Sequence, residues 1–301
     1  MSVFRLPKPI KRLHWKYRLL LWQIQRRFRD SVTLHTKQGI FQLPLDTSDA
    51  VSQHLYTRRE FELELIESSL AVLRRAGKCP PRGQGTVLDI GANNGVISIG
   101  MLATGQLERA IAIEPDPRNF ELLQRNVQAN GLEQQFTCLN YAAADGESEL
   151  AFELSEDNFG DHRVRQTSPT TGDHELFDES GRRVIQVPAD TVDHLIAAVD
   201  REFTDKLALI WVDVQGYEGH VFRGARDLLR RDIPVMAEIW PYGLSRAGTP
   251  EEEFCEIVSG LWSTYWVEHR NRFTQHPIAD FSAFLNSLGR GGKFKNVIFT
   301  K

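Results

Sequence analysis

A glycine-rich loop that follows an acidic residue is the most chemically suggestive pattern in the sequence. The apolar segment 86–90 contains Asp89 and runs into Gly91-Ala-Asn-Asn-Gly95, after which a helix is expected. Glycine permits positive φ and lets a ligand approach the backbone, and the start of a helix presents unpaired N–H groups. Asn93 stands where many nucleotide-binding loops have a middle glycine, and asparagine tolerates the left-handed region well. The loop therefore predicts a site for a nucleoside-containing ligand.

A second acid, Glu114, ends the next apolar segment, in Ala112-Ile-Glu-Pro-Asp116. A carboxylate at that strand end can accept hydrogen bonds from both ribose hydroxyls of a nucleoside. No GxxxxGK[ST] run is present, which argues against ATP hydrolysis. Asp89 at the loop mouth suits a positively charged amine better than a pyrophosphate, which favours S-adenosylmethionine over NAD. A nicotinamide-dependent oxidoreductase stays the alternative. The residues expected to bind the cofactor here are Asp89, Gly91, Asn93, Asn94, Gly95 and Glu114.

Three carboxylates near later strand ends are candidates for a catalytic base, because ligands bind at the carboxyl ends of parallel strands. They are Asp213, Glu218 and Glu238. Asp213 could equally orient the cofactor, and Glu218 could be a first-turn helix residue favoured by the helix dipole. Glu238 lies among apolar residues, where a charge is costly unless it is paired or functional.

Two histidines are alternative bases. His162 lies in the polar segment 154–183, a long insertion of the kind that often forms a lid or a substrate loop. A histidine in such a loop is expected to be solvated. His220 falls on a predicted helix face and is expected to be structural. No cluster of residues shows metal-ligand spacing, so no metal is predicted.

Strand and helix patterns alternate from residue 86 to the C-terminus, which predicts a parallel, doubly wound α/β sheet. The segment between residues 146 and 187 is polar, with fragments of strand. The last two strands follow one another without a strand–helix repeat, as in an antiparallel closing hairpin. Strands are expected at 86–90, 109–113, 136–141, 207–214, 234–240, 265–269 and 295–300, and helices at 94–104, 117–130, 191–198, 218–230 and 250–263.

Four stretches of the sequence resemble the FkbM-type methyltransferase family: VLDIGANNGVISI (87–99), AIEPDPRNFELLQRNV (112–127), WVDVQGYEGHVFRGA (211–225) and AEIWP (237–241). The resemblance implies a class I methyltransferase Rossmann-like fold: a mostly parallel seven-stranded sheet with a C-terminal antiparallel hairpin. It implies S-adenosylmethionine as cofactor and O-methylation of a hydroxyl on a sugar, glycan or polyketide-like small molecule. It also implies that Asn140 lies near the adenine and that Asp213 faces the methyl-transfer site. Gln215 departs from the family, because many members have glutamate there.

The N-terminal region reads as a helical extension. A basic amphipathic helix is expected at 12–29, a hairpin at 31–43 and a helix at 58–76, and a Pro/Gly cluster follows. These features predict an extension over residues 1–80 and a cofactor-binding domain over 81–301. The basic helix either packs on the domain or a partner, or lies on an anionic membrane surface.

Composition limits the possible partners. The chain has 301 residues, 41% hydrophobic, with net charge −4, although residues 1–30 hold nine Lys/Arg and a single acid. The acidic remainder argues against nucleic-acid binding. Three scattered cysteines favour a reducing, cytoplasmic compartment, and no segment is long and apolar enough to span a membrane. A non-catalytic, membrane-associated adaptor is a further alternative, and the oligomeric state is left open.

Overall fold

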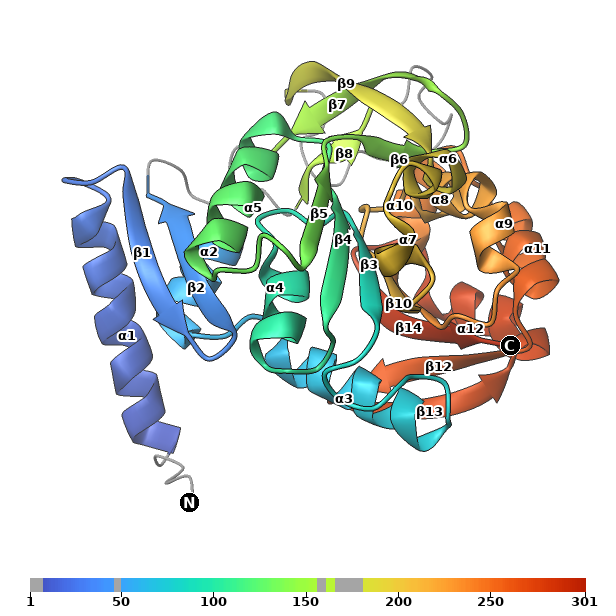
Figure 1. Cartoon of the computed structure of the whole chain (residues 1–301), viewed down its shortest axis with the longest axis horizontal. Coiled ribbons are helices and arrows are strands. Elements are labelled where there is room, and N and C mark those ends of the chain that lie inside the picture. The colour runs from blue at the N-terminus through green and yellow to red at the C-terminus, as the bar shows by residue number, and fades with distance from the viewer. Residues whose placement is uncertain (1–7, 46–49, 156–160, 166–180) are drawn as a thin grey trace.

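A computed structural model describes residues 8–45, 50–155, 161–165 and 181–301, with side chains from residue 15 onward. An eight-stranded sheet runs through the middle of the chain in the order β13-β12-β14-β11-β10-β3-β4-β5 (Figure 1). Strands β10 and β3 are buried along their whole length, as expected for parallel strands covered on both faces. The strands are β3 (Thr86–Ile90), β4 (Arg109–Ile113), β5 (Phe136–Leu139), β10 (Leu207–Val212), β11 (Val235–Ile239), β12 (Thr264–His269), β13 (Arg272–Pro277) and β14 (Lys295–Thr300).

The strand directions confirm the predicted fold class. Strands β11, β10, β3, β4 and β5 are mutually parallel, whereas β14 lies antiparallel between β11 and β12. This is the mostly parallel sheet, closed by an antiparallel pair, that the late strands predicted. The strand count was one too low, because β13 adds an eighth strand beside β12. Its sequence, RFTQHP, is polar and largely exposed, so it lacks the apolar pattern that reveals a strand.

Helices cover both faces of the sheet because neighbouring strand residues point to opposite sides. Val87 belongs to one hydrophobic cluster and Leu88 to the other. The first cluster takes in α3 (Leu63–Arg75), α4 (Val96–Ala103) and α5 (Pro117–Ala129). The second takes in α6 (Val192–Ala197), α7 (Arg201–Thr204), α8 (Glu218–Gly224), α9 (Arg226–Leu229), α10 (Pro241–Arg246), α11 (Glu251–Leu261) and α12 (Phe281–Leu288).

The polar region between β5 and α6 forms a second, smaller sheet in the order β6-β9-β7-β8. It lies above the large sheet in the view of Figure 1. Its strands are β6 (Ala142–Ala144), β7 (Ser148–Leu154), β8 (Arg163–Val164) and β9 (Arg183–Thr191). The sequence indicated strand fragments here but not a sheet, because the pairing of β6 with β9 joins segments far apart in the chain.

The N-terminal region consists of α1 (Lys8–Gln25), the antiparallel hairpin β1 (Ser31–Thr36) and β2 (Gly39–Pro44), and α2 (Ala50–Arg58). The helix expected at 58–76 is confirmed over most of its length as α3, but its start is wrong, because residues 59–62 are not helical. The chain breaks between α2 and α3, where Arg59 and Glu62 have positive φ. Gln38 in the hairpin turn fixes this break: its amide accepts from Phe61 N at 2.8 Å and donates to Phe61 O at 3.0 Å. Tertiary hydrogen bonds therefore override the local helical pattern.

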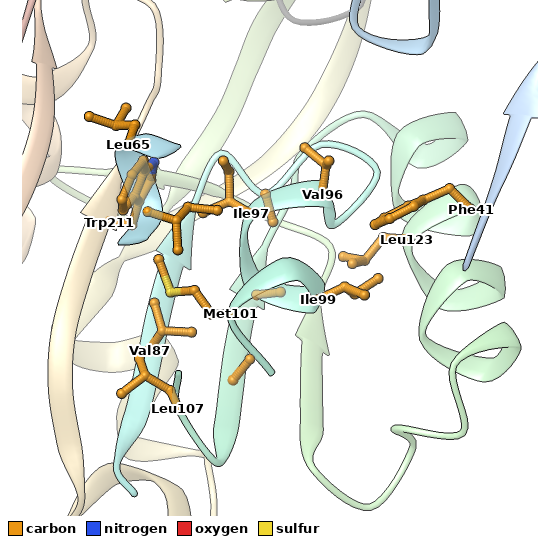
Figure 2. Packing of buried hydrophobic residues seen from close by; sticks show 14 of the residues in the cluster. Phe41, Leu65, Val87, Val96, Ile97, Ile99, Met101, Leu107, Leu123 and Trp211 are labelled. Atoms are coloured by element: carbon orange, nitrogen blue, oxygen red, sulfur yellow. The ribbon is translucent and has the colours of Figure 1, made fainter. Parts of the chain in front are cut away.

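The hairpin shares its core with the first face of the large sheet. Figure 2 shows Phe41 of β2 pointing toward Leu123 of α5 and Ile99 of α4, and all three side chains are fully buried. One hydrophobic cluster thus extends across residue 80, and the division at that residue stays a prediction. None of the described helices is both long and apolar enough to cross a membrane.

Candidate functional site

A groove composed of two adjoining cavities lies at the carboxyl ends of the parallel strands. Both cavities are lined by Gly91, Asn93, Asp213 and Gln215. The first cavity also reaches Glu114, Tyr141 and the small sheet, and the second reaches Asp89, Glu62 and Glu238. The second is the more spacious, with a volume of about 270 Å³. The groove therefore brings together acids from β3, β4, β10 and β11.

The glycine loop has the conformation that the sequence predicted. Gly91 has φ +86°, and a Cβ built on it would lie 1.9 Å from Asp213 O, so only glycine lets the two loops meet. Asn93 has φ +51° and lines both cavities, as expected for a residue in place of glycine. Asn94 and Gly95 do not line the groove. Asn94 is buried and accepts from Val96 N at 3.2 Å, while a Cβ on Gly95 would lie 2.6 Å from Leu123 Cδ1.

Glu114 connects the end of β4 to the glycine loop. One carboxylate oxygen accepts from Asn93 N at 2.8 Å and the other from Asp116 N at 2.9 Å. Burial raises the pKa of Glu114 to about 8, against the lowering effect of these N–H groups. The Asn119 side chain also donates to this carboxylate. Two carboxylate oxygens have about four acceptor positions, so Glu114 can hold the loop and still accept from a ligand hydroxyl in the first cavity.

Asn140 holds the turn after β4, and its expected place near the adenine stays a prediction. Its Nδ2 donates to Glu114 O at 2.8 Å and to Pro115 O at 3.1 Å, and it is not among the residues that line the groove. The amide is committed to these loop carbonyls. The neighbouring Tyr141, which is partly exposed, lines the first cavity instead.

Asp89 lines the second cavity from within β3. The residue is 1% exposed, and its Oδ2 has no hydrogen-bond partner among the described residues. Burial raises the pKa of Asp89 to about 7, although hydrogen bonds from Ser98 lower it. A buried carboxylate oxygen without a partner is costly, and a cationic or hydrogen-bonding ligand would relieve that cost.

Asp213 and Glu238 face one another through Gln215. The Gln215 amide Nε2 donates to Asp213 Oδ1 at 2.6 Å and to Glu238 Oε1 at 3.4 Å. Burial raises the pKa of Asp213 to about 6, and it raises the pKa of Glu238 well above its ordinary value, with a further contribution from Asp213. A glutamate at 215 would add a third negative charge and remove the donor. The departure from the family pattern therefore has a local electrostatic explanation.

Glu218 does not reach the groove. It is fully buried, and its Oε1 accepts from Val214 N and Gly216 N, each at 3.3 Å. The side chain thus holds the 213–217 loop that carries Asp213 and Gln215. This position fits the structural alternative for Glu218 better than the role of a base that touches substrate.

Glu62 is a groove residue that the sequence did not reveal. It sits at the break before α3 with φ +50° and lines the second cavity beside Asp213 and Glu238. The side chain keeps an exposed surface, and partial desolvation together with the charges of Asp213 and Glu268 raises the pKa of Glu62. No motif marks Glu62, because the hydrogen bonds of Gln38 to Phe61 place it.

His162 is buried, contrary to the expectation of a solvated loop histidine. Its Nδ1 accepts from Ser155 N at 2.9 Å, which leaves the proton of a neutral ring on Nε2, 3.2 Å from Asp116 Oδ2. The ring lines the first cavity and ties the small sheet to the end of β4. Burial opposes ionisation of Asp116, but the bonds from His162 and Arg118 N outweigh it and lower the pKa of Asp116.

His220 is structural, as expected. Its ring stacks on Tyr217 at 4.0 Å, and its nitrogens lie 2.9 Å from Asp145 Oδ2 and 2.8 Å from Ala247 O. Within the described ranges, no group of three or more His, Cys, Asp or Glu side chains is arranged to hold a metal ion.

Comparison with known proteins places these features in a family. A family model described as Methyltransferase FkbM domain matches residues 89–264. Among solved structures, the chain is similar to methyltransferase FkbM from Methylobacillus flagellatus, at 15% identity and TM-score 0.44, over 94% of this chain and 59% of that one. The chain thus spans less than two thirds of that protein. No curated protein matches the chain.

The chain is also similar to two further solved structures. One is TYW2 from P. horikoshii in complex with MeSAdo, at 11% identity and TM-score 0.39, covering 98% of this chain and 84% of that one. The other is precorrin-6y C5,15-methyltransferase from Geobacter metallireducens, at 10% identity and TM-score 0.39, covering 77% of this chain and 88% of that one.

Proposed function

The chain belongs to the FkbM methyltransferase family, and we propose that it uses S-adenosylmethionine to methylate a hydroxyl group of a sugar, glycan or polyketide-like small molecule. The observation that carries this proposal is the Asp213–Gln215–Glu238 arrangement. Asp213 and Gln215 line both cavities of the groove, and Glu238 lines the second. It puts two potential proton acceptors in the lining of the groove.

The residues of the groove fit this cofactor. Glu114 in the first cavity can accept from ribose hydroxyls, and the unpartnered Oδ2 of Asp89 in the second can accept from an ammonium group. S-adenosylmethionine, when bound, supplies an activated methyl group and a sulfonium leaving group. Gly91 and Asn93, which line both cavities, give the backbone clearance for a ligand that passes from one cavity to the other.

Glu238 is the proposed base and Asp213 the proposed orienting carboxylate. A sugar hydroxyl is a weak nucleophile, and a carboxylate with a raised pKa accepts its proton more readily than an ordinary one. The pKa of Glu238 is raised most strongly by burial and next by Asp213. Gln215 holds both side chains with one amide, so the hydroxyl would be positioned between groups that are already oriented.

The lining of the second cavity supports a neutral, hydroxyl-rich acceptor. Its charged residues are Glu62, Asp89, Asp213 and Glu238, and no Lys, Arg or His of the described chain lines it. Carboxylates accept hydrogen bonds from hydroxyls but repel phosphates, so a nucleic-acid acceptor is disfavoured. Phe294, half exposed at this cavity, supplies an apolar surface for a ring.

We also propose that the protein is cytoplasmic, and the state of its cysteines supports this. Cys79, Cys138 and Cys255 are all unpaired thiols. Unpaired cysteines are typical of reducing compartments.

The test begins with calorimetric titration of the full chain by S-adenosylhomocysteine, with NADH as the matched control ligand. Saturable binding of S-adenosylhomocysteine alone is expected. Methyl transfer from labelled S-adenosylmethionine to a panel of saccharides and polyketides is then measured by mass spectrometry. Binding of NADH instead would overturn the cofactor assignment, and transfer only to amines or nucleic acid would overturn the acceptor assignment.

A further inference from the structure

Helix α1 carries a row of exposed apolar side chains. Tyr17 is 62% exposed, Leu20 54%, Ile24 45% and Phe28, in the turn after the helix, 80%. Spacings of three and four residues align them along one side of the helix. Only two other large hydrophobic side chains of the described chain are exposed, so this row, the α1 stripe, concentrates the exposed apolar surface in one place.

The α1 stripe is not the face by which the helix is attached. The sequence suggested a stripe that could pack on the domain, but the buried anchor is Trp22, whose ring lies 5.1 Å from that of Tyr56 in α2. Arg18 donates to Thr57 O and Arg26 to Leu45 O, each at 3.1 Å. Because these contacts hold the other side of α1 against the protein, the stripe faces outward. In Figure 1, α1 lies at the edge of the molecule, beside the hairpin.

Basic residues surround the stripe. Residues 1–30 contain nine Lys/Arg and one acid, although the whole chain has a net charge of −4. Lys16, Arg27 and Arg29 are exposed, and none of them forms an ion pair within the part of the chain that is described. A second copy of this helix would bring like charges together. Nucleic acid would match the charge but leave the apolar stripe in water.

We propose that α1 docks the protein on an anionic lipid surface. The α1 stripe would enter the boundary between headgroups and acyl chains, and Lys16, Arg27 and Arg29 would lie against the headgroups. The acidic remainder of the chain is repelled by the same surface, so α1 would approach first. The proposal concerns the N-terminal region alone and does not depend on the methyl-transfer assignment.

The experiment is co-sedimentation of the full chain with phosphatidylcholine vesicles, with and without phosphatidylglycerol, at low and high salt. We expect binding only to the anionic vesicles, weakened by salt. The variant Leu20→Ser/Phe28→Ser should bind at least about tenfold more weakly, because it removes two inserted side chains. Arg27→Gln should weaken binding about fivefold. Arg230 is an exposed basic residue outside α1, so the Arg230→Gln variant is the matched control and should bind like the wild type.

Thermal unfolding followed by circular dichroism would show that the variants are folded, as expected for exposed positions. Failure of the wild type to bind anionic vesicles would overturn the proposal. A dimer of the wild type in analytical ultracentrifugation that is absent in the Leu20→Ser/Phe28→Ser variant would also overturn it. The α1 stripe would then be a protein interface. Binding to nucleic acid that depends on Arg27 but not on Leu20 would likewise overturn it.

Discussion

The raised pKa of Asp89 predicts that the affinity for a ligand with an ammonium group depends on pH. Asp89 has a pKa of about 7, chiefly because of burial, and its Oδ2 has no partner in the described chain. An ammonium ligand binds the ionised carboxylate, so affinity should fall as pH falls through that pKa. The ionised fraction rises from about 9% at pH 6 to about 76% at pH 7.5, which predicts a Kd about eightfold lower at pH 7.5.

The assay is calorimetric titration with S-adenosylhomocysteine over this pH range, with methylthioadenosine as the matched control because it lacks the ammonium group. Asp89→Asn should bind S-adenosylhomocysteine as weakly as the protonated wild type and show a flat pH profile. Glu62→Gln should keep the pH dependence that arises from Asp89. If the wild-type Kd is constant between pH 6 and 7.5, or if methylthioadenosine shows the same slope, Asp89 does not receive the ammonium group.

Three further changes test neighbouring parts of the groove. Glu238→Gln should leave the Kd for S-adenosylhomocysteine within about twofold and lower kcat by about 100-fold or more, as measured by methyl transfer, and normal turnover would contradict a base at 238. Gln215→Glu should raise the pKa of Glu238 and move the acidic limb of the kcat–pH profile about one unit upward; an unmoved limb would argue against the electrostatic account of Gln215. Gly91→Ala should destabilise the protein by about 1–3 kcal/mol and lower the urea midpoint, because its Cβ would lie 1.9 Å from Asp213 O.

The sequence predicted the parts of the groove that depend on neighbouring residues. The glycine loop, Glu114 and Asp213 each directly follow or end an apolar strand, and parallel strands bring their carboxyl ends to one edge. The role of Asn93 could be predicted because the loop requires a residue that tolerates positive φ at this position. These features were found because strand pattern and motif coincide within a few residues.

The parts that escaped prediction depend on contacts between distant segments. Glu62 enters the groove because Gln38, in another element, breaks the helix that local periodicity favours. His162, beside β8 of the small sheet, contacts Asp116 at the start of α5, and no sequence pattern near either residue predicts that contact. Asn140 donates its Nδ2 to the carbonyls of Glu114 and Pro115, a contact that its position in the motif does not reveal.

The charge of the groove suggests an order of binding for the proposed reaction. Asp89 is buried, and Asp213 and Glu238 are half-buried in the same cavity. Desolvation raises the pKa values of all three carboxyls, and among the described residues no basic side chain lines this cavity. A cationic ligand that binds beside Asp89 and Asp213 should lower the pKa values of these carboxylates and promote ionisation of Glu238. The base would then become competent only after the cofactor has bound.

This order can be checked from the protons released on binding, measured by calorimetry in buffers that differ in ionisation enthalpy. If only Asp89 ionises, S-adenosylhomocysteine should release at most one proton below pH 7. Release of more than one proton would mean that the coupled pair Asp213 and Glu238 ionises with it, as the cofactor-first order requires. The Glu238→Gln variant distinguishes the two cases, because it removes the second proton and leaves the one from Asp89. Release of one proton by both the wild type and the Glu238→Gln variant would refute the cofactor-first order. The protonation state of Glu238 would then not depend on cofactor binding.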